Sequence, residues 1–184
     1  MTEGQIASIH ARLLNRAKAR GEDFNLILTR YALERFLYRL SLAPAREAYW
    51  LKGAMLFDLW FDVPHRPTRD ADFLGFGPMD IEALANTVRE ICGITVDDGM
   101  AYDPDSITVE EIREDARYGG LRVRLLGLLG KARCTGCNST WATAMPSRRV
   151  RRRRFIRPCW MISRRHVCVS IRARRWWPRS WRRS

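Results

Sequence analysis

The stretch that decides the fold reads Arg66-Pro67-Thr68-Arg69-Asp70-Ala71-Asp72-Phe73-Leu74. Acidic and apolar residues alternate from Asp70 onward, which is typical of a strand with one buried face. On such a strand Asp70 and Asp72 project from the same face because they lie two residues apart. Two neighbouring carboxylates can bind a hard cation such as Mg²⁺ through oxygen. The sequence therefore predicts a metal site formed by Asp70 and Asp72.

A second candidate feature lies just upstream, at Lys52-Gly53-Ala54. Residues 48–51 are predicted as a short buried strand, and helical character resumes over residues 54–61. A glycine turn at the start of a helix presents backbone N–H groups that can bind a phosphate. Further anion donors precede the two aspartates: Arg66, Thr68 and Arg69. Together these residues predict a combined metal and phosphate site.

Hydrophobic periodicity predicts the other elements. Helices are expected over residues 6–14, ending before Gly21, over residues 24–40, ending before Pro44, and over residues 79–92, closed by Gly93. Strands are expected over residues 70–76, 94–96, 107–112 and 121–126, the last two forming a hairpin through Tyr118-Gly119-Gly120. This order of elements predicts an α+β domain with a mixed sheet.

The composition of the chain changes after residue 133. The last 51 residues contain 15 arginines, no lysine and no acid, whereas the preceding residues hold slightly more acids than bases, and the whole chain has a formal charge of +13. The whole-chain charge therefore does not by itself indicate a nucleic-acid-binding protein. We expect residues 1–133 to form one domain and residues 134–184 to form a disordered tail, because like charges without partners repel.

The sequence also indicates in which cellular compartment the protein resides. No apolar run approaches the roughly 20 residues that span a bilayer, and no apolar signal-peptide region follows the N-terminus. An odd number of cysteines, five, argues against a disulfide framework. These observations predict a cytoplasmic protein that does not enter a membrane.

Three stretches of the sequence are similar to motifs of a known protein family. They are Tyr31-Ala32-Leu33-Glu34-Arg35-Phe36-Leu37-Tyr38-Arg39-Leu40, Leu51-Lys52-Gly53-Ala54, and Arg66-Pro67-Thr68-Arg69-Asp70-Ala71-Asp72-Phe73. With them, residues 5–133 resemble the AbiEii/AbiGii toxin family of the nucleotidyltransferase superfamily. The resemblance implies a toxin component, countered by a cognate antitoxin, that transfers a nucleotide from an NTP to an acceptor such as tRNA. It implies that Asp70 and Asp72 bind Mg²⁺, that the turn at Gly53 faces the nucleotide phosphates, and that a later strand supplies a third carboxylate. Ala54 departs from the family, which often has Gly there.

That third carboxylate should follow residues 121–131, yet no Asp or Glu occurs there or later. Reading the tail one base back permits Gln-Leu-Asp-Val-Gly-Asp-Gly-Asp-Ala over residues 137–146, with the missing Asp encoded across Ser139 and Thr140. We therefore interpret the tail as the product of a frameshift near residues 131–136, which leaves a truncated and inactive nucleotidyltransferase.

Other hypotheses stay open at this stage. The chain could be a non-catalytic remnant that binds nucleotide or RNA weakly. It could be a basic RNA-binding protein, because Arg neutralises phosphate and Trp stacks on bases. The tail could also hold zinc, which needs four tetrahedral ligands, and the candidate ligands are Cys134, Cys137, Cys159, His166 and Cys168.

Overall fold

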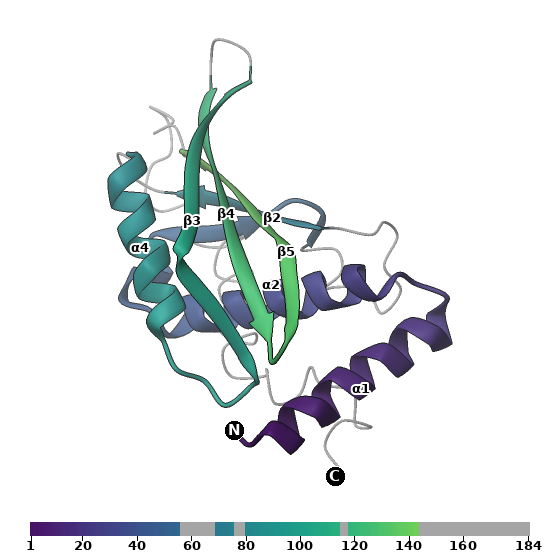
Figure 1. Cartoon of the computed structure of the whole chain (residues 1–184). Coiled ribbons are helices and arrows are strands. Elements are labelled where there is room, and N and C mark those ends of the chain that lie inside the picture. Colours follow the sequence, from purple (N-terminus) through teal and green to yellow (C-terminus); the bar gives the residue numbers. More distant parts are fainter. Residues whose placement is uncertain (56–68, 76–79, 115–117, 144–184) are drawn as a thin grey trace, which may run out of the picture. The chain divides into compact units, whose positions relative to one another are not determined.

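The structure is a computed structural model and describes residues 1–55, 69–75, 80–114 and 118–143. Its elements are α1 (Glu3–Arg20), α2 (Phe24–Leu42), the 3₁₀ helix η1 (Pro44–Glu47), β1 (Tyr49–Lys52), β2 (Asp70–Gly75), α4 (Ile81–Gly93), β3 (Met100–Glu114), β4 (Tyr118–Leu129) and β5 (Ala132–Thr143). The predicted α+β class with a mixed sheet is confirmed (Figure 1). No helix in the described ranges is long and apolar enough to cross a membrane.

The five strands form one sheet in the order β1-β2-β5-β4-β3. Strand β5, the last strand within the described residues, is parallel to β2 on one side and antiparallel to β4 on the other. The remaining neighbours, β1 with β2 and β3 with β4, are antiparallel. The connection from β2 to β5 includes α4 and the β3–β4 hairpin, so the centre of the sheet forms from segments far apart in sequence (Figure 1).

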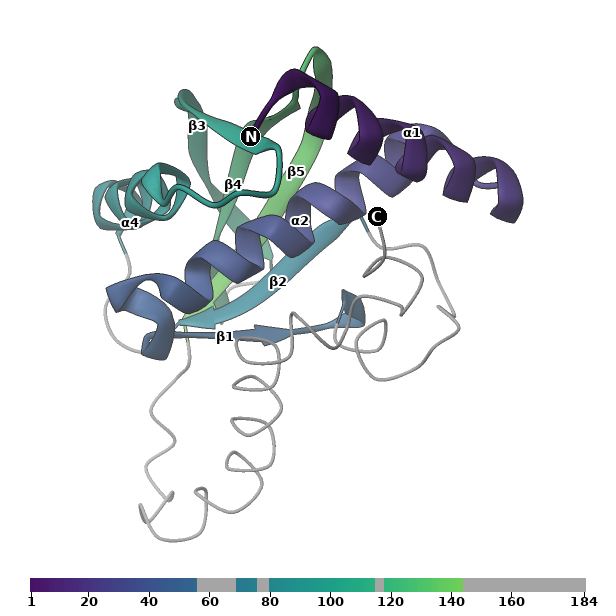
Figure 2. The same cartoon turned by 90° about the horizontal axis from the view of Figure 1, so that it is seen from below.

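Helix α2 lies across one face of the sheet (Figure 2). It begins after Asp23, whose side chain accepts a hydrogen bond from Leu26 N at 3.1 Å and so caps the helix. Its apolar residues meet a buried face of the sheet, and the core forms between the two layers. We call this the covered face, and its buried sheet residues include Leu51, Ala71, Phe73, Tyr102, Leu121, Val123, Leu125, Cys134, Cys137, Ser139 and Trp141.

The predicted helix ends coincide with local capping interactions. Thr2 and Gln5 form a capping box at the start of α1, and Gly21 ends this helix in the left-handed conformation, with φ 63°. Asp80 caps α4 by accepting from Ala83 N at 2.8 Å, so the helix begins at Ile81 rather than at residue 79. The three long helices predicted from periodicity are confirmed, with shifts of a few residues at their ends.

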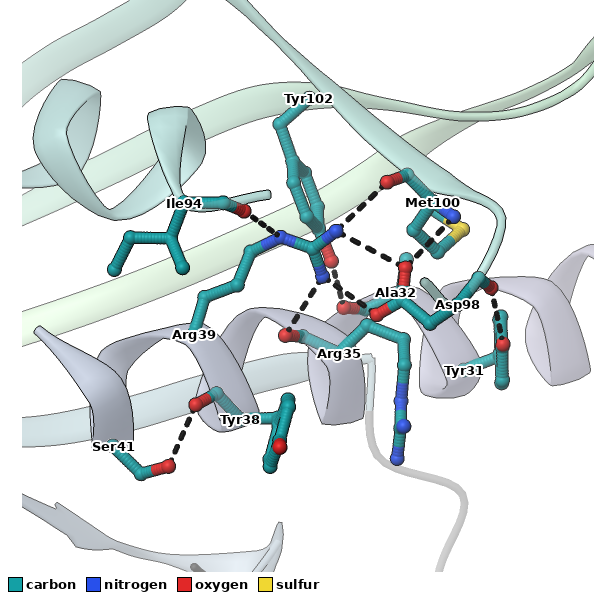
Figure 3. Close-up of polar contacts among 10 residues, drawn as sticks. All are labelled: Tyr31, Ala32, Arg35, Tyr38, Arg39, Ser41, Ile94, Asp98, Met100 and Tyr102. Atoms are coloured by element: carbon teal, nitrogen blue, oxygen red, sulfur yellow. Dashed lines mark hydrogen bonds and ion pairs between the residues drawn. The ribbon is translucent and has the colours of Figure 1, made fainter. Parts of the chain in front are cut away.

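A buried ion pair ties α2 to the segment between α4 and β3 (Figure 3). Arg39 donates from Nη1 to Asp98 Oδ2 at 2.7 Å and from Nη2 to Asp98 Oδ1 at 3.0 Å, and the two residues are 2% and 6% exposed. Arg39 also donates to the carbonyl oxygens of Ile94, Arg35 and Met100. The guanidinium group thus has a partner for each of its N–H directions, which is the condition for burying a charge without a large penalty.

The strand predicted at residues 94–96 is wrong. These residues belong to the loop between α4 and β3. The Ile94 carbonyl accepts from Arg39 Nε at 3.0 Å, and Ile94 N donates to Ile91 O at the end of α4. The backbone groups of Ile94 are therefore used by a helix and a side chain, which the local apolar pattern does not reveal.

The hairpin of β3 and β4 is confirmed, but its predicted turn is wrong. Tyr118-Gly119-Gly120 pairs with β3 inside the ladder, so the chain reverses between Glu114 and Tyr118, and the turn itself lies outside the described residues. Glycine is common in turns but is also accommodated within strands. The strands extend beyond the predicted ranges, because their pairing continues on both sides of the apolar segments.

The predicted boundary at residue 133 falls inside β5, and the prediction of disorder is wrong for residues 134–143. These residues carry no charge, since the arginines of the tail begin at Arg148. Trp141 is fully buried and stacks on Phe73 with ring centroids 4.1 Å apart. The composition shift therefore does not mark the end of the fold. Predictions for residues 144–184 lie outside the described residues.

Candidate metal and phosphate site

Asp70 and Asp72 lie on the face of the sheet that is turned away from α2, which we call the opposite face. Ala71 and Phe73 alternate with them and are fully buried on the covered face, whereas Asp70 is exposed and Asp72 is half-buried. The structure thus brings both carboxylates to one face, as the i, i+2 spacing predicts. On the opposite face we include Lys52, Asp70, Asp72, Thr108, Glu110, Arg122, Arg124, Asn138 and Thr140.

The glycine turn lies directly beside Asp72. Lys52 pairs with Asp72 in the antiparallel β1–β2 ladder, and Gly53 follows with φ 75°. A Cβ atom built on Gly53 would overlap the Asp72 carboxylate at Oδ2. Only glycine permits both the left-handed backbone and this close approach. The phosphate-binding turn and the metal-binding carboxylate predicted from sequence are therefore neighbours in space.

The other predicted phosphate-binding residues divide into two groups. Ala54 is exposed and begins a helix, and Arg69 is exposed immediately before β2. Arg66 and Thr68 lie outside the described residues. The structure therefore gathers Lys52, Gly53 and Ala54 at the β1 side of Asp72, whereas Arg69 precedes Asp70 along the chain.

On the other side of β2, strand β5 contributes neutral polar residues. The parallel register pairs Asp70 with Asn138 and Asp72 with Thr140, so these side chains share the opposite face. Asn138 and Thr140 are not among the site residues predicted from sequence, because the change in composition after residue 133 places them in a tail expected to be disordered. The usable signal was the alternation of these polar residues with Cys137, Ser139 and Trp141, which is a strand pattern.

Within the ranges the structure describes, no three or more His, Cys, Asp or Glu residues group together to hold a metal ion. The β5 residue in register with Asp72 is Thr140, which carries a hydroxyl and no charge. Asp70, Asp72, Asn138 and Thr140 all offer oxygen atoms, which are the donors that Mg²⁺ accepts. The donor set fits a hard cation in its chemistry, but with two carboxylates rather than three.

Two arginines follow on β4. Arg122 pairs with Thr140 and Arg124 pairs with Asn138, so both guanidinium groups start on the opposite face, two strands from the aspartates. Arg124 Nη1 lies 2.6 Å from Glu110 Oε1, an exposed pair of small energetic weight. The opposite face therefore runs from a lysine through two acids and two neutral residues to two arginines.

The predicted zinc ligands are not gathered by the described structure. Cys134 and Cys137 are buried on β5 with their Sγ atoms 3.2 Å apart, and Cys134 Sγ lies 3.5 Å from Thr29 Oγ1. Cys159, His166 and Cys168 lie outside the described residues. The first cysteine pair packs in the core beneath α2, which is a structural position.

Shifted pKa values occur on the covered side of the sheet. Burial raises the pKa of Cys92 to about 12 and raises the pKa values of Tyr31 and Tyr102. The hydrogen bond with Cys134, followed by burial, raises the pKa of the Cys137 thiol. All four groups are held neutral within the core, so their protonation contributes to stability rather than to chemistry on the opposite face.

Comparison with known proteins identifies the lineage. The model of the family described as Nucleotidyl transferase AbiEii toxin, Type IV TA system, matches residues 35–135, more than half of the chain. A search of curated proteins finds no match. The matched range includes the end of β1 at Lys52, the turn at Gly53 and both aspartates of β2, and it extends into the start of β5. The chain belongs to the AbiEii family of nucleotidyltransferase-like toxins of type IV toxin–antitoxin systems.

Proposed function

We propose that this chain is a toxin component whose site is built for Mg²⁺-dependent transfer of a nucleotide from an NTP to an RNA acceptor such as tRNA. The observation that carries this proposal is the contact between the turn at Gly53 and the Asp72 carboxylate on the opposite face. Family membership implies an antitoxin partner. We propose that this partner is a cognate protein and that both act in the cytoplasm, where NTPs and tRNA occur.

The proposed roles follow from the position of each residue. Asp70 and Asp72 hold the cation, and Lys52 and Arg69 attract the triphosphate by charge. The backbone around Gly53 and Ala54 approaches the phosphates closely because Gly53 has no side chain. Arg66 and Thr68 precede this site in sequence, and we propose that they add donors to the same triphosphate. A bound cation would neutralise phosphate charge and orient the attacking oxygen.

We propose that this chain lacks the third carboxylate that nucleotide transfer requires, and that residue 140 is the position where it is missing. Thr140 stands in register with Asp72 and carries no charge. An in-line displacement at phosphorus depends on ligands that fix the cation against the reacting phosphate. We therefore propose that nucleotide transfer by the 184-residue chain is lost or very weak. The absence of any acid after Asp115 is the specific observation that favours this non-catalytic remnant over an active toxin.

One substitution separates these two possibilities. The full chain and its Thr140→Asp variant are incubated with labelled NTP, Mg²⁺ and total tRNA, and the covalently labelled RNA is measured on denaturing gels. Denaturation removes RNA that is merely bound by the arginines of the tail. We expect no labelled RNA above background from the native chain, and a signal at least about tenfold above that background from Thr140→Asp, because loss of even an outer partner of a metal site costs about 10- to 100-fold.

The controls test the assignment of the aspartates. Thr140→Asn has nearly the same shape as Thr140→Asp without its charge, and it should remain inactive. Combining Thr140→Asp with Asp72→Asn should abolish any gain. Transfer by the native chain that depends on Asp70 would rule out the remnant. Absence of transfer by Thr140→Asp, with unimpaired folding and NTP binding, would contradict the assignment of residue 140 as the third position.

A further inference from the structure

The side chain of Asn138 contains a buried oxygen without a partner. Its Oδ1 atom is shielded from solvent and accepts no hydrogen bond, and within the described residues it is the only side-chain oxygen in that condition. A buried acceptor that loses its bonds to water and gains none in return costs stability. Such groups in native proteins call for an explanation, and an absent ion or water is one of the usual ones.

The residues beside Asn138 indicate which kind of group could bind its Oδ1 atom. Across the sheet Asn138 stands between Asp70 on β2 and Arg124 on β4. Arg124 directs Nη1 to Glu110 Oε1 at 2.6 Å. When ionised, the Asp70 carboxylate offers only acceptor oxygens, so it cannot donate to Asn138 Oδ1. A cation coordinates an amide oxygen and a carboxylate together, whereas a bridging water molecule donates one hydrogen bond to each, so the metal-binding measurement below decides between the two.

The dimensions of a sheet suit a shared cation. Neighbouring strands lie about 4.8 Å apart, and oxygen ligands surround Mg²⁺ at about 2.1 Å or a larger ion at up to about 2.6 Å. Side chains from two adjacent strands can therefore reach one ion from opposite sides. Amide and carboxylate oxygens both occur among the protein ligands of such hard cations.

We propose that Asn138 supplies the third protein oxygen to the cation held by Asp70 and Asp72. This inference rests on the proposed function, since it needs the two aspartates to bind a cation. Asn138 adds a neutral ligand to the two charged ones, while Thr140 keeps the position where we propose a carboxylate is missing, so the site has three protein ligands but only two negative charges. Because affinity rises with ligand charge, the native chain binds the cation, but more weakly than a site with three carboxylates.

The test measures binding of Mn²⁺ alone to the full chain, by the loss of the electron paramagnetic resonance signal of free Mn²⁺. Asn138→Leu keeps approximately the same volume and removes the oxygen, whereas Asn138→Asp keeps the shape and adds charge. We expect Kd to rise about tenfold or more in Asn138→Leu and to fall about tenfold in Asn138→Asp. Thr108→Val, which removes a hydroxyl from β3 in the same row of the sheet, should bind Mn²⁺ like the native chain.

A second measurement separates ligation from a structural role. Without metal, Asn138→Leu should melt at the same temperature as the native chain or higher, because the unsatisfied acceptor is removed. Its rise in melting temperature on adding Mn²⁺ should be smaller than that of the native chain, because tighter binding gives greater stabilisation. A lower melting temperature without metal, together with an unchanged Mn²⁺ affinity, would assign Asn138 to packing and overturn the proposal.

The aspartate variants distinguish this inference from the proposed function. If Asp70→Asn and Asp72→Asn weaken Mn²⁺ binding while Asn138→Leu does not, Asn138 is not a ligand and the two-carboxylate site remains. If none of the three substitutions changes the Kd, the cation site itself is wrong and both proposals fail.

Discussion

The two faces of the sheet differ in how their buried polar groups are hydrogen-bonded. On the helix-covered side, Arg39 is buried with a partner for each N–H direction, and Trp141 Nε1 donates to Ser139 Oγ at 2.7 Å. On the opposite face, Asn138 Oδ1 is buried without a partner. The buried groups of Arg39 and Trp141 are thus hydrogen-bonded within the chain, whereas the Asn138 oxygen, in register with Asp70, is where we propose that a cation binds.

Strands β2 and β5 contribute to both faces by alternation. Phe73 and Trp141 stack on the covered face, while Asp72 and Thr140 stand in register on the opposite face. Residues adjacent in sequence should therefore respond differently to substitution. Changes on the covered face should lower stability, and changes on the opposite face should alter binding with little effect on stability.

The largest expected loss of stability follows from substitution of Trp141 on the covered face. Trp141→Ala removes a fully buried ring that packs on Phe73 and on Tyr49, with centroids 4.1 and 4.6 Å away. We expect the free energy of unfolding to fall by about 3–5 kcal/mol, as is typical of large aromatic truncations. Urea denaturation followed by circular dichroism measures this loss.

The adjacent substitution Thr140→Val is the control for Trp141→Ala and should change stability by no more than about 0.5 kcal/mol. Amide exchange gives an independent measure, and the amides of β5 should be protected like those of β4. Rapid exchange throughout residues 134–143 would show that β5 is not a stable strand and would remove the basis of the comparison.

The buried ion pair gives the next largest effect. Asp98→Ala leaves the Arg39 charge buried without its carboxylate, so we expect a loss of about 3 kcal/mol or more. Glu110→Ala breaks the exposed pair with Arg124 and should cost less than about 1 kcal/mol. The two variants are compared by urea denaturation at the same ionic strength. Equal losses would mean that burial does not distinguish the two pairs.

The sequence predicts the locally specified part of this fold. Periodicity and capping residues place α1, α2 and α4, and the alternation around Asp70 places β2 with both aspartates on one face. The glycine at position 53 marks the turn because its conformation and its contact with Asp72 both exclude a side chain. These features depend on residues that are close in sequence or on one backbone conformation.

The unpredicted part depends on long-range pairing. Strand β5 enters the centre of the sheet beside β2, and nothing in the local pattern of residues 132–143 specifies that parallel partner. Arg39 resembles an ordinary surface charge on an amphipathic helix, yet it is buried by a partner 59 residues away. Asn138 gained significance only from its register with Asp70 and its buried oxygen.

Gly53→Ala tests the contact between the turn and Asp72. Alanine is strained at φ 75°, and its Cβ would displace the Asp72 carboxylate. We expect a stability loss of about 1–2 kcal/mol and a Kd for Mn²⁺ about tenfold higher.

Gly21→Ala is a matched control, because Gly21 has φ 63° but no neighbouring atom lies within 4 Å of the position that an alanine Cβ would take. It should lose stability without any change in Mn²⁺ binding, and identical binding by Gly53→Ala would show that the turn does not position Asp72.

The smallest effect expected is on the alkaline stability profile, through Cys92 on the covered side. Burial raises the pKa of this thiol from 9.0 to about 12, so the native state retains a proton that the unfolded state releases. The stabilisation is complete below pH 9 and is lost as the pH rises from 9 towards 12, by about 1 kcal/mol per pH unit for one such group.

In Cys92→Ala this contribution is absent, so the free energy of unfolding should fall less steeply between about pH 9 and about pH 10.5, whatever the packing cost of the substitution at neutral pH. Urea denaturation at half-unit pH steps compares the slopes rather than the absolute stabilities, which separates proton linkage from lost packing. Parallel profiles for the native chain and Cys92→Ala would mean that the thiol titrates alike in the folded and unfolded states, and that its burial does not hold it neutral.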